Sequence, residues 1–271
     1  MPAIATAEQT DSIMGQLERP TMRERVSEAE WAARVELAAL YRMVHHFGMT
    51  DLIANHITMR VPGEPGHILI NAYGLMYDEV TASNLYKITL DGDVVLKPDV
   101  DLGLNITGYV IHGAIHAARD DLHVVIHTHS AAGSGVSAMR CGLLPVSQHA
   151  ALIDGRIGYH DYEGAAFNLA ERERFVANLG GGNLLILRNH GLIAGGSTCA
   201  EAFMGIYRLE MACKIQVAAL AGGMDNALPM PAEALENTRR ILIEHPSIGA
   251  GTLQWQALLR RLERVDPSWK E

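Results

Sequence analysis

The sequence has few cysteines, no long hydrophobic run and no excess of positive charge. Its 271 residues include 3 cysteines, Cys141, Cys199 and Cys213. An odd number without Cys-x-x-Cys spacing argues against disulfides and cysteine-bound zinc. No apolar stretch is long enough to cross a membrane, and no secretion signal opens the chain, so we expect a cytoplasmic protein without a membrane partner. The formal net charge of -9 argues against nucleic acid as a general partner.

The overall composition of the chain is typical of a globular α/β protein. Hydrophobic residues make up 48% and charged residues 20% of the chain, and its length gives ample volume for a core. Residues 1–25 are interpreted as an N-terminal tail or arm, because most of them show no periodicity. Residues 26–271 are interpreted as one domain that ends in additional helices.

Helical and strand patterns alternate through this domain. Capping boxes at Ser27 and Thr198 predict the starts of two long helices, and Asp-Gly at 91–92 predicts a hairpin. Residues 145–153 are expected to form strand and loop, and residues 159–162 a loop. The pattern predicts a three-layer α/β/α fold, with a mainly antiparallel central sheet and helices on both faces.

Residues 123–130 carry the strongest chemical signal, a His-x-His pair at the end of an apolar run. The β-branched residues before the pair predict a buried strand. Side chains alternate along a strand, so His127 and His129 point to the same side and start roughly 7 Å apart. The two rings can therefore converge on one ion, although such a pair alone is more often structural.

A third histidine has a similar position. The apolar run 184–187 predicts another buried strand, and His190 follows it where the chain breaks at a glycine. Neutral imidazole is the commonest transition-metal ligand in proteins. We therefore interpret His127, His129 and His190 as the ligands of one divalent ion per subunit, Fe(II) or Zn(II).

A further histidine pair, His112 and His116, has the i, i+4 spacing of one helix face. The residues between them are Gly-Ala-Ile, without the acidic residue of a zincin helix. We interpret this pair as packing beneath the expected strand or as supporting the metal ligands from behind.

Several spaced motifs resemble the class II aldolase/adducin family. They are His-Thr-His-Ser at 127–130, the segment 136–147, Gly-Tyr-His-Asp-Tyr-Glu-Gly at 158–164 and Asn-His-Gly-Leu at 189–192. The segment 136–147 is most similar to the head domain of adducin and its bacterial relatives. The first half of the chain is also similar to the non-haem iron oxygenase of aminocoumarin antibiotic biosynthesis, which belongs to the same fold group.

The resemblance implies a cyclic homotetramer with active sites between subunits and a small-molecule substrate. It also implies that zinc or a similar divalent ion is held by three histidines. Those histidines match His127, His129 and His190, in agreement with the argument from strand geometry.

Departures from the family pattern argue against a sugar-phosphate substrate. The aldolases carry an acid/base carboxylate where this chain has Gly108, and glycine cannot move a proton. Of the residues that hold substrate phosphate in the aldolases, only Asn55, Gly74 and Thr107 keep the pattern, and lost donors weaken the binding of a dianion. These three residues remain candidates for binding a substrate without phosphate.

The same resemblance provides three more candidates. Tyr73 is a candidate catalytic residue and is expected to line a pocket that suits an apolar or aromatic substrate. His149 aligns with a proton-donating tyrosine of some aldolases and is a candidate acid or base. His56 is a candidate to line the substrate pocket.

The expected function is a divalent-metal-dependent enzyme that makes or breaks a C–C bond next to a carbonyl. Its substrate would be a small, non-phosphorylated keto or hydroxy acid of apolar or aromatic character. The missing carboxylate at Gly108 favours an Fe(II) oxygenase with oxidative cleavage or decarboxylation, and a Zn(II)-dependent aldolase or lyase is the alternative. An adducin-like assembly module without catalysis is a further alternative, which has no need of three converging imidazoles.

Overall fold

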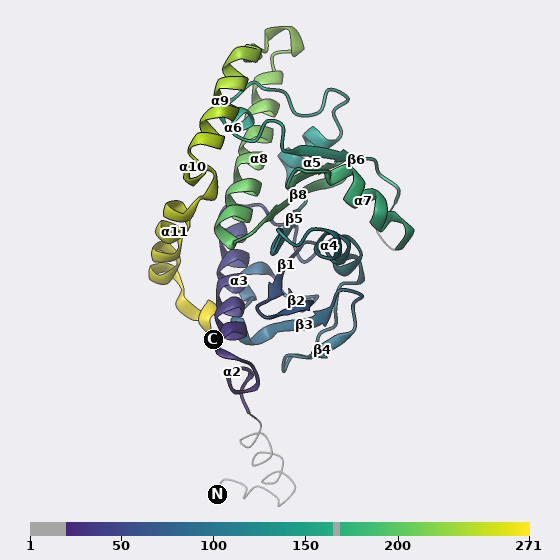
Figure 1. The fold of residues 1–271 in the computed structure, drawn as a ribbon, viewed down its shortest axis with the longest axis vertical. Helices are drawn as coiled ribbons and strands as arrows, with labels where there is room; N and C mark the ends of the chain where they lie inside the picture. Colours follow the sequence, from purple (N-terminus) through teal and green to yellow (C-terminus); the bar gives the residue numbers. More distant parts are fainter. Residues whose placement is uncertain (1–19, 165–168) are drawn as a thin grey trace, which may run out of the picture.

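One mixed sheet organises the molecule, for which the computed structural model describes residues 20–164 and 169–271. Its eight strands lie in the order β4-β3-β2-β1-β5-β8-β7-β6. Figure 1 shows α3 and α8 along one side of the sheet and α4 and α7 along the other. The expected three-layer α/β/α fold is therefore confirmed.

The strands pair almost entirely antiparallel, and only β6 runs parallel to its neighbour β7. Their bounds are β1 (His56–Val61), β2 (Glu64–Asn71), β3 (Leu85–Thr89), β4 (Val94–Leu96), β5 (Val124–Thr128), β6 (Ile157–His160), β7 (Leu184–Leu187) and β8 (Gly191–Gly196). In the register of β1 with β5, His56 lies opposite His127. The middle of the sheet therefore places two histidines side by side.

The predicted capping residues begin the two long helices. The hydroxyls of Ser27 and Thr198 each accept a hydrogen bond from the backbone N–H three residues later. The α-helices of the described residues are α2 (Met22–Arg25), α3 (Glu28–His46), α4 (Ile106–Ala118), α5 (Ala131–Ser137), α6 (Gln148–Ala151), α7 (Arg172–Leu179), α8 (Cys199–Leu220), α9 (Ala232–Glu244), α10 (Ser247–Ala250) and α11 (Thr252–Val265). Of the expected N-terminal tail, residues 1–19 lie outside the described residues. None of the described helices combines the length and apolar composition needed to cross a membrane.

Side-chain alternation divides the core between the two faces of the sheet. On β5, Ile126 packs in the large core beneath α3 and α8, whereas Val125 packs in the smaller core with α4 and α7. His127 is two residues after Val125 on the same strand, so its side chain lies on the same face, the α4 side. On β1, Ile57 packs in the large core, which places His56 on the α4 side as well.

Two expectations of local structure are wrong. Residues 145–153 contain α6, a short helix capped by Ser147, and not a strand. Tyr159 and His160, expected in a loop, end β6. This strand has only four residues and pairs with β7 at the edge of the sheet, so its structure depends on a partner that no local pattern reveals.

Candidate metal centre

Three imidazoles meet where β5 ends and where β7 turns into β8. Nε2 of His129 lies 2.8 Å from Nε2 of His127 and 2.8 Å from Nε2 of His190. His127 is buried in the sheet, and the other two rings are partly buried. The structure thus brings together all three histidines that the sequence indicates as ligands.

The turn before β8 is shaped to present His190. Asn189 has a φ of 57°, a left-handed conformation that asparagine tolerates better than most residues. The backbone N–H of His190 donates to Ser137 Oγ at 3.2 Å. A Cβ on Gly191 would lie 2.3 Å from the carbonyl oxygen of Thr128. Only glycine therefore lets β8 approach β5 closely enough to set His190 against the His-x-His pair.

Hydrogen bonds determine which ring nitrogen of His127 and of His129 faces the point where the three imidazoles converge. Nδ1 of His127 donates to the carbonyl oxygen of Leu192 at 3.0 Å, and Nδ1 of His129 donates to Oδ2 of Asp51 at 3.3 Å. In a neutral ring, Nε2 then carries the lone pair. Two lone pairs face each other across 2.8 Å, an arrangement that is favourable only with a cation between them.

Burial keeps these rings neutral. Desolvation lowers the pKa of His127 well below its usual value. It also lowers the pKa of His129, against the opposing hydrogen bond to Asp51, and it is the main cause that lowers the pKa of His190 to about 4. Because a metal binds the neutral imidazole, this donor set fits a divalent ion such as Zn(II) or Fe(II).

The three histidines line a cavity of about 490 Å³. Its other lining residues are Asp51, Ala54, His56, Ile111, Ser134, Tyr162, Gly164 and Asn189. The ring centroid of Tyr162 lies 6.2 Å from that of His190, so the aromatic surface of the cavity comes from Tyr162. No spacing or motif in the sequence marks Asp51 as part of this site, and the motif at 158–164, which contains Tyr162, does not by itself show that Tyr162 lines the cavity.

Two of the expected substrate-binding residues lie in or beside the cavity. His56 lines it. Asn55 is buried, and its Oδ1 accepts a hydrogen bond from the N–H of Asp51 at 2.7 Å, while its Nδ2 has no partner in the described part of the chain. Thr107 lies in the first turn of α4, and its side chain is outside the described residues.

Three other candidates do not reach the cavity of their own chain. Tyr73 pairs through its backbone with Gly103, and the residue is 43% exposed. Gly74, the next residue, lies against the Leu102 side chain. His149 lies on α6, and its ring centroid is 6.2 Å from that of Tyr207.

Gly108 packs directly against an imidazole. A Cβ on Gly108 would lie 3.3 Å from Cγ and Cδ2 of His56. The ring of His56 therefore stands close to the position where the sequence lacks the family carboxylate.

A second cluster of possible ligands has no free imidazole nitrogen. Nε2 of His160 donates to Oε1 of Glu171 at 3.0 Å, and Nδ1 accepts from the side-chain amide of Asn178 at 2.9 Å. Glu163, the third member, pairs with Arg174. Both ring nitrogens of His160 are thus used within the protein.

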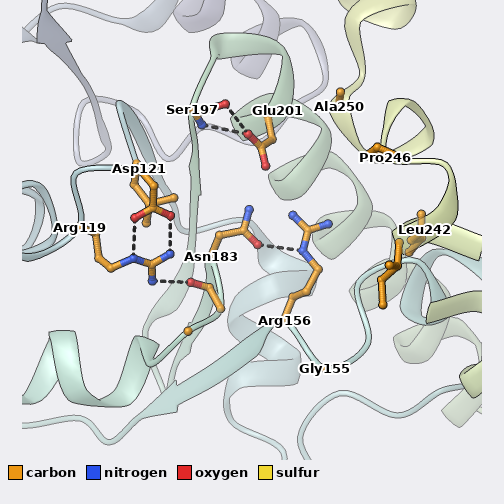
Figure 2. A pocket seen from close by; sticks show the side chains of 15 residues that line it. Arg119, Asp121, Gly155, Arg156, Asn183, Ser197, Glu201, Leu242, Pro246 and Ala250 are labelled. Carbon is orange, nitrogen blue, oxygen red and sulfur yellow. Dashed lines mark hydrogen bonds and ion pairs between the residues drawn. The ribbon is translucent and has the colours of Figure 1, made fainter. Parts of the chain in front are cut away.

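A larger hollow, of about 620 Å³, is lined by α9, α10, the start of α8 and the loop before β6 (Figure 2). The guanidinium of Arg119 pairs with Asp121, and Nε of Arg156 donates to Asn183 at 3.0 Å. Its lining contains no histidine or cysteine. The three-histidine cavity is therefore the place where the described residues offer metal chemistry.

Comparisons with known proteins agree with this geometry. The family model for the Class II Aldolase and Adducin N-terminal domain matches residues 35–217. An aldolase II superfamily protein from Pseudomonas syringae is 46% identical, with a TM-score of 0.88 over 93% of this chain and 100% of that one. An L-fuculose 1-phosphate aldolase from Glaciozyma antarctica PI12 is 25% identical, with a TM-score of 0.79 over 95% and 99% of the two chains. Rat (Rattus norvegicus) alpha-adducin is 48% identical over 196 residues, which are 71% of this chain and 26% of the adducin.

Proposed function

Because this chain belongs to the class II aldolase and adducin family, we propose that it is a divalent-metal-dependent lyase. It would make or break a C–C bond next to a carbonyl in a small, non-phosphorylated hydroxy or keto acid. The observation that carries the proposal is the convergence of three neutral imidazoles, His127, His129 and His190, on one cavity. A module with only a structural role has no physical need for facing lone pairs.

A divalent ion held by these rings would act as a Lewis acid toward the oxygens of a bound acid. The surrounding residues prepare the ligands for it. Asp51 and the Leu192 carbonyl oxygen hold two of the rings with Nε2 toward the cavity. Three neutral ligands leave the ion its full positive charge, which favours binding of a carboxylate together with a neighbouring oxygen.

The lining of the cavity supports a substrate without phosphate. The described lining residues include no lysine or arginine, the side chains that usually pair with phosphate. Ile111 and Tyr162 add apolar and aromatic surface, so we propose an acid with an apolar or aromatic substituent.

We further propose that the site is completed in a homotetramer. Nδ2 of Asn55 and Nδ1 of His149 are buried and have no hydrogen-bond partner in the described single chain. Buried polar groups without partners are costly, so a ligand or a neighbouring subunit is expected to satisfy them. His149 and Tyr73, which do not reach the cavity of their own chain, would serve a neighbouring one.

The test uses the full chain, stripped of metal and loaded separately with Zn(II) or Fe(II). A panel of non-phosphorylated hydroxy and keto acids, including aryl-pyruvates, is assayed for carbonyl products and for oxygen uptake. A carbonyl product formed by the zinc form without oxygen uptake supports the proposal. Cleavage that needs both Fe(II) and oxygen would replace the lyase by an oxygenase. His129→Ala is expected to abolish turnover, and His123→Ala, which alters an exposed histidine before β5, is the control.

A second candidate is a non-catalytic assembly module. The 48% identity to alpha-adducin over 196 residues favours it. Metal analysis of the purified protein separates the two candidates, because about one ion per chain supports the lyase. A protein that neither contains metal nor binds added zinc would favour the assembly module.

A further inference from the structure

A row of hydrogen-bonded side chains leads from the cavity into the core. Nδ1 of His56 lies 3.0 Å from Nε2 of His112, whose Nδ1 lies 2.8 Å from Thr58 Oγ1. The same hydroxyl lies 2.8 Å from Nε2 of His116, whose Nδ1 lies 3.1 Å from the carbonyl oxygen of Leu122. We call His56, His112, Thr58 and His116 the histidine row. All four side chains are buried.

The inner end of the histidine row sets the direction of every hydrogen bond in it. The carbonyl oxygen of Leu122 can only accept, so Nδ1 of His116 donates to it and Nε2 of His116 carries a lone pair. The Thr58 hydroxyl therefore donates to His116 and accepts from Nδ1 of His112. Nε2 of His112 then accepts from Nδ1 of His56. At the outer end, Nε2 of His56 is left with a lone pair and no proton.

Burial excludes the alternative in which a ring carries two protons. Desolvation is the main cause that lowers the pKa of His116 to about 3 and the pKa of His112 well below its usual value. The His56 ring is buried, and its hydrogen-bond partner His112 offers no negative charge that would stabilise a second proton. Each ring therefore carries one proton near neutral pH. If each ring carries one proton and every hydrogen bond of the row ran in the opposite direction, Nδ1 of His116 would carry a lone pair. That lone pair would face the lone pairs of the Leu122 carbonyl oxygen.

The outer end of the row opens on the candidate metal centre. His56 lines the three-histidine cavity, and its Nε2 has no hydrogen-bond partner among the described residues. Its ring centroid lies 5.2 Å from that of His127. Contact with Gly108 on one side and the bond to His112 on the other hold the ring in place.

We propose that Nε2 of His56 is a fixed hydrogen-bond acceptor that selects a substrate hydroxyl beside the three ligand histidines. The identity of the substrate as a metal-bound acid rests on the proposed function. An acceptor without a proton binds an O–H group but repels a ketone oxygen, which can only accept. Within the proposed class of substrates, the site therefore prefers a hydroxy acid to the corresponding keto acid.

Neutron diffraction from deuterium-exchanged crystals of the full chain tests the direction of the row. Deuterium is expected on Nδ1 of His56, His112 and His116. Deuterium on Nε2 of His56 would overturn the proposal. This result depends on neither bound metal nor turnover, so it stands apart from the outcome for the proposed function.

Calorimetry on the zinc-loaded protein, with phenyllactate and phenylpyruvate as matched probes, tests the selection. One neutral hydrogen bond is expected to give phenyllactate a roughly two- to tenfold lower Kd. Thr58 does not itself line the cavity, and Thr58→Val interrupts the row and should abolish this preference. Thr128→Val is the matched control, because the Thr128 hydroxyl on the neighbouring strand β5 is buried and has no hydrogen-bond partner in the described part of the chain.

Equal affinity of the wild-type protein for both acids would overturn the selection of a hydroxyl. So would a preference that persists unchanged in Thr58→Val. Binding of neither acid would refute the proposed substrate class together with the selection, while the deuterium positions would still decide the direction of the row.

Discussion

Oδ2 of Asp51 accepts a hydrogen bond from Nδ1 of His129 over 3.3 Å, although 78 residues separate them in the chain. Asp51 lies in the loop before β1, and His129 directly follows β5. The contact therefore ties two loops together and turns Nε2 of His129 toward the other two imidazoles. A carboxylate behind a histidine ligand also makes the ring a better donor to a metal.

Replacing this carboxylate is expected to weaken metal binding without removing a ligand. Asp51→Asn should lower zinc affinity about 10- to 100-fold, in line with other supporting residues of metal sites. Competition with a chromophoric chelator measures the change. Asp78→Asn is the matched control, because Asp78 lies 3.8 Å from Nδ1 of His45, away from the cavity. Unchanged affinity in Asp51→Asn would mean that the contact does not orient His129.

A methyl group on Gly191 should separate the ligands. Its Cβ would lie 2.3 Å from the Thr128 carbonyl oxygen, so Gly191→Ala must push β8 away from β5. We expect a loss of about 1–3 kcal/mol in the free energy of unfolding, together with loss of most of the bound zinc. Denaturant titration and metal analysis measure the two effects. Gly66→Ala, where a Cβ would meet nothing within 4 Å, is the control, and an equal effect there would contradict the explanation.

Two threonines on neighbouring strands should respond in opposite ways to the same change. Thr58→Val leaves nitrogens of His112 and His116 without a partner in the core and should lower the free energy of unfolding by about 1–3 kcal/mol. Thr128→Val removes a buried hydroxyl that makes no hydrogen bond to any described residue and should be neutral or stabilising. Denaturant titration at one protein concentration compares them. Equal destabilisation would show that the Thr58 hydroxyl contributes little.

The buried His116 should make stability depend on pH. Burial is the main cause that lowers its pKa from 6.5 to about 3 in the folded chain. As pH falls from 6.5 toward 3, the unfolded chain binds a proton that the folded chain does not, so the folded state loses stability. His116→Gln cannot take up this proton. The stability difference between wild type and His116→Gln should therefore narrow by about 1.6 kcal/mol between pH 6.5 and pH 5. Parallel pH curves for the two proteins would contradict this explanation.

The sequence by itself determined the fold class and the three histidines that meet. Apolar runs, strand alternation and two helix caps encode local structure directly, because each depends only on residues close together in the chain. The resemblance to the class II aldolase/adducin family, carried by four spaced motifs, is confirmed. His127 and His129 share a face for the same local reason, and His190 follows a strand whose apolar run is unmistakable.

Only the tertiary structure decided which residues surround these histidines. Strand alternation shows which face a side chain takes but not which strand or helix lies opposite. Asp51 therefore could not be recognised from the sequence, and the motif at 158–164 could not show that its Tyr162 lines the cavity. Tyr73, expected to line a pocket, is 43% exposed. The histidine row is the clearest case, because β1 and α4 each contribute alternate members of it. Its hydrogen bonds exist only once those two elements pack together.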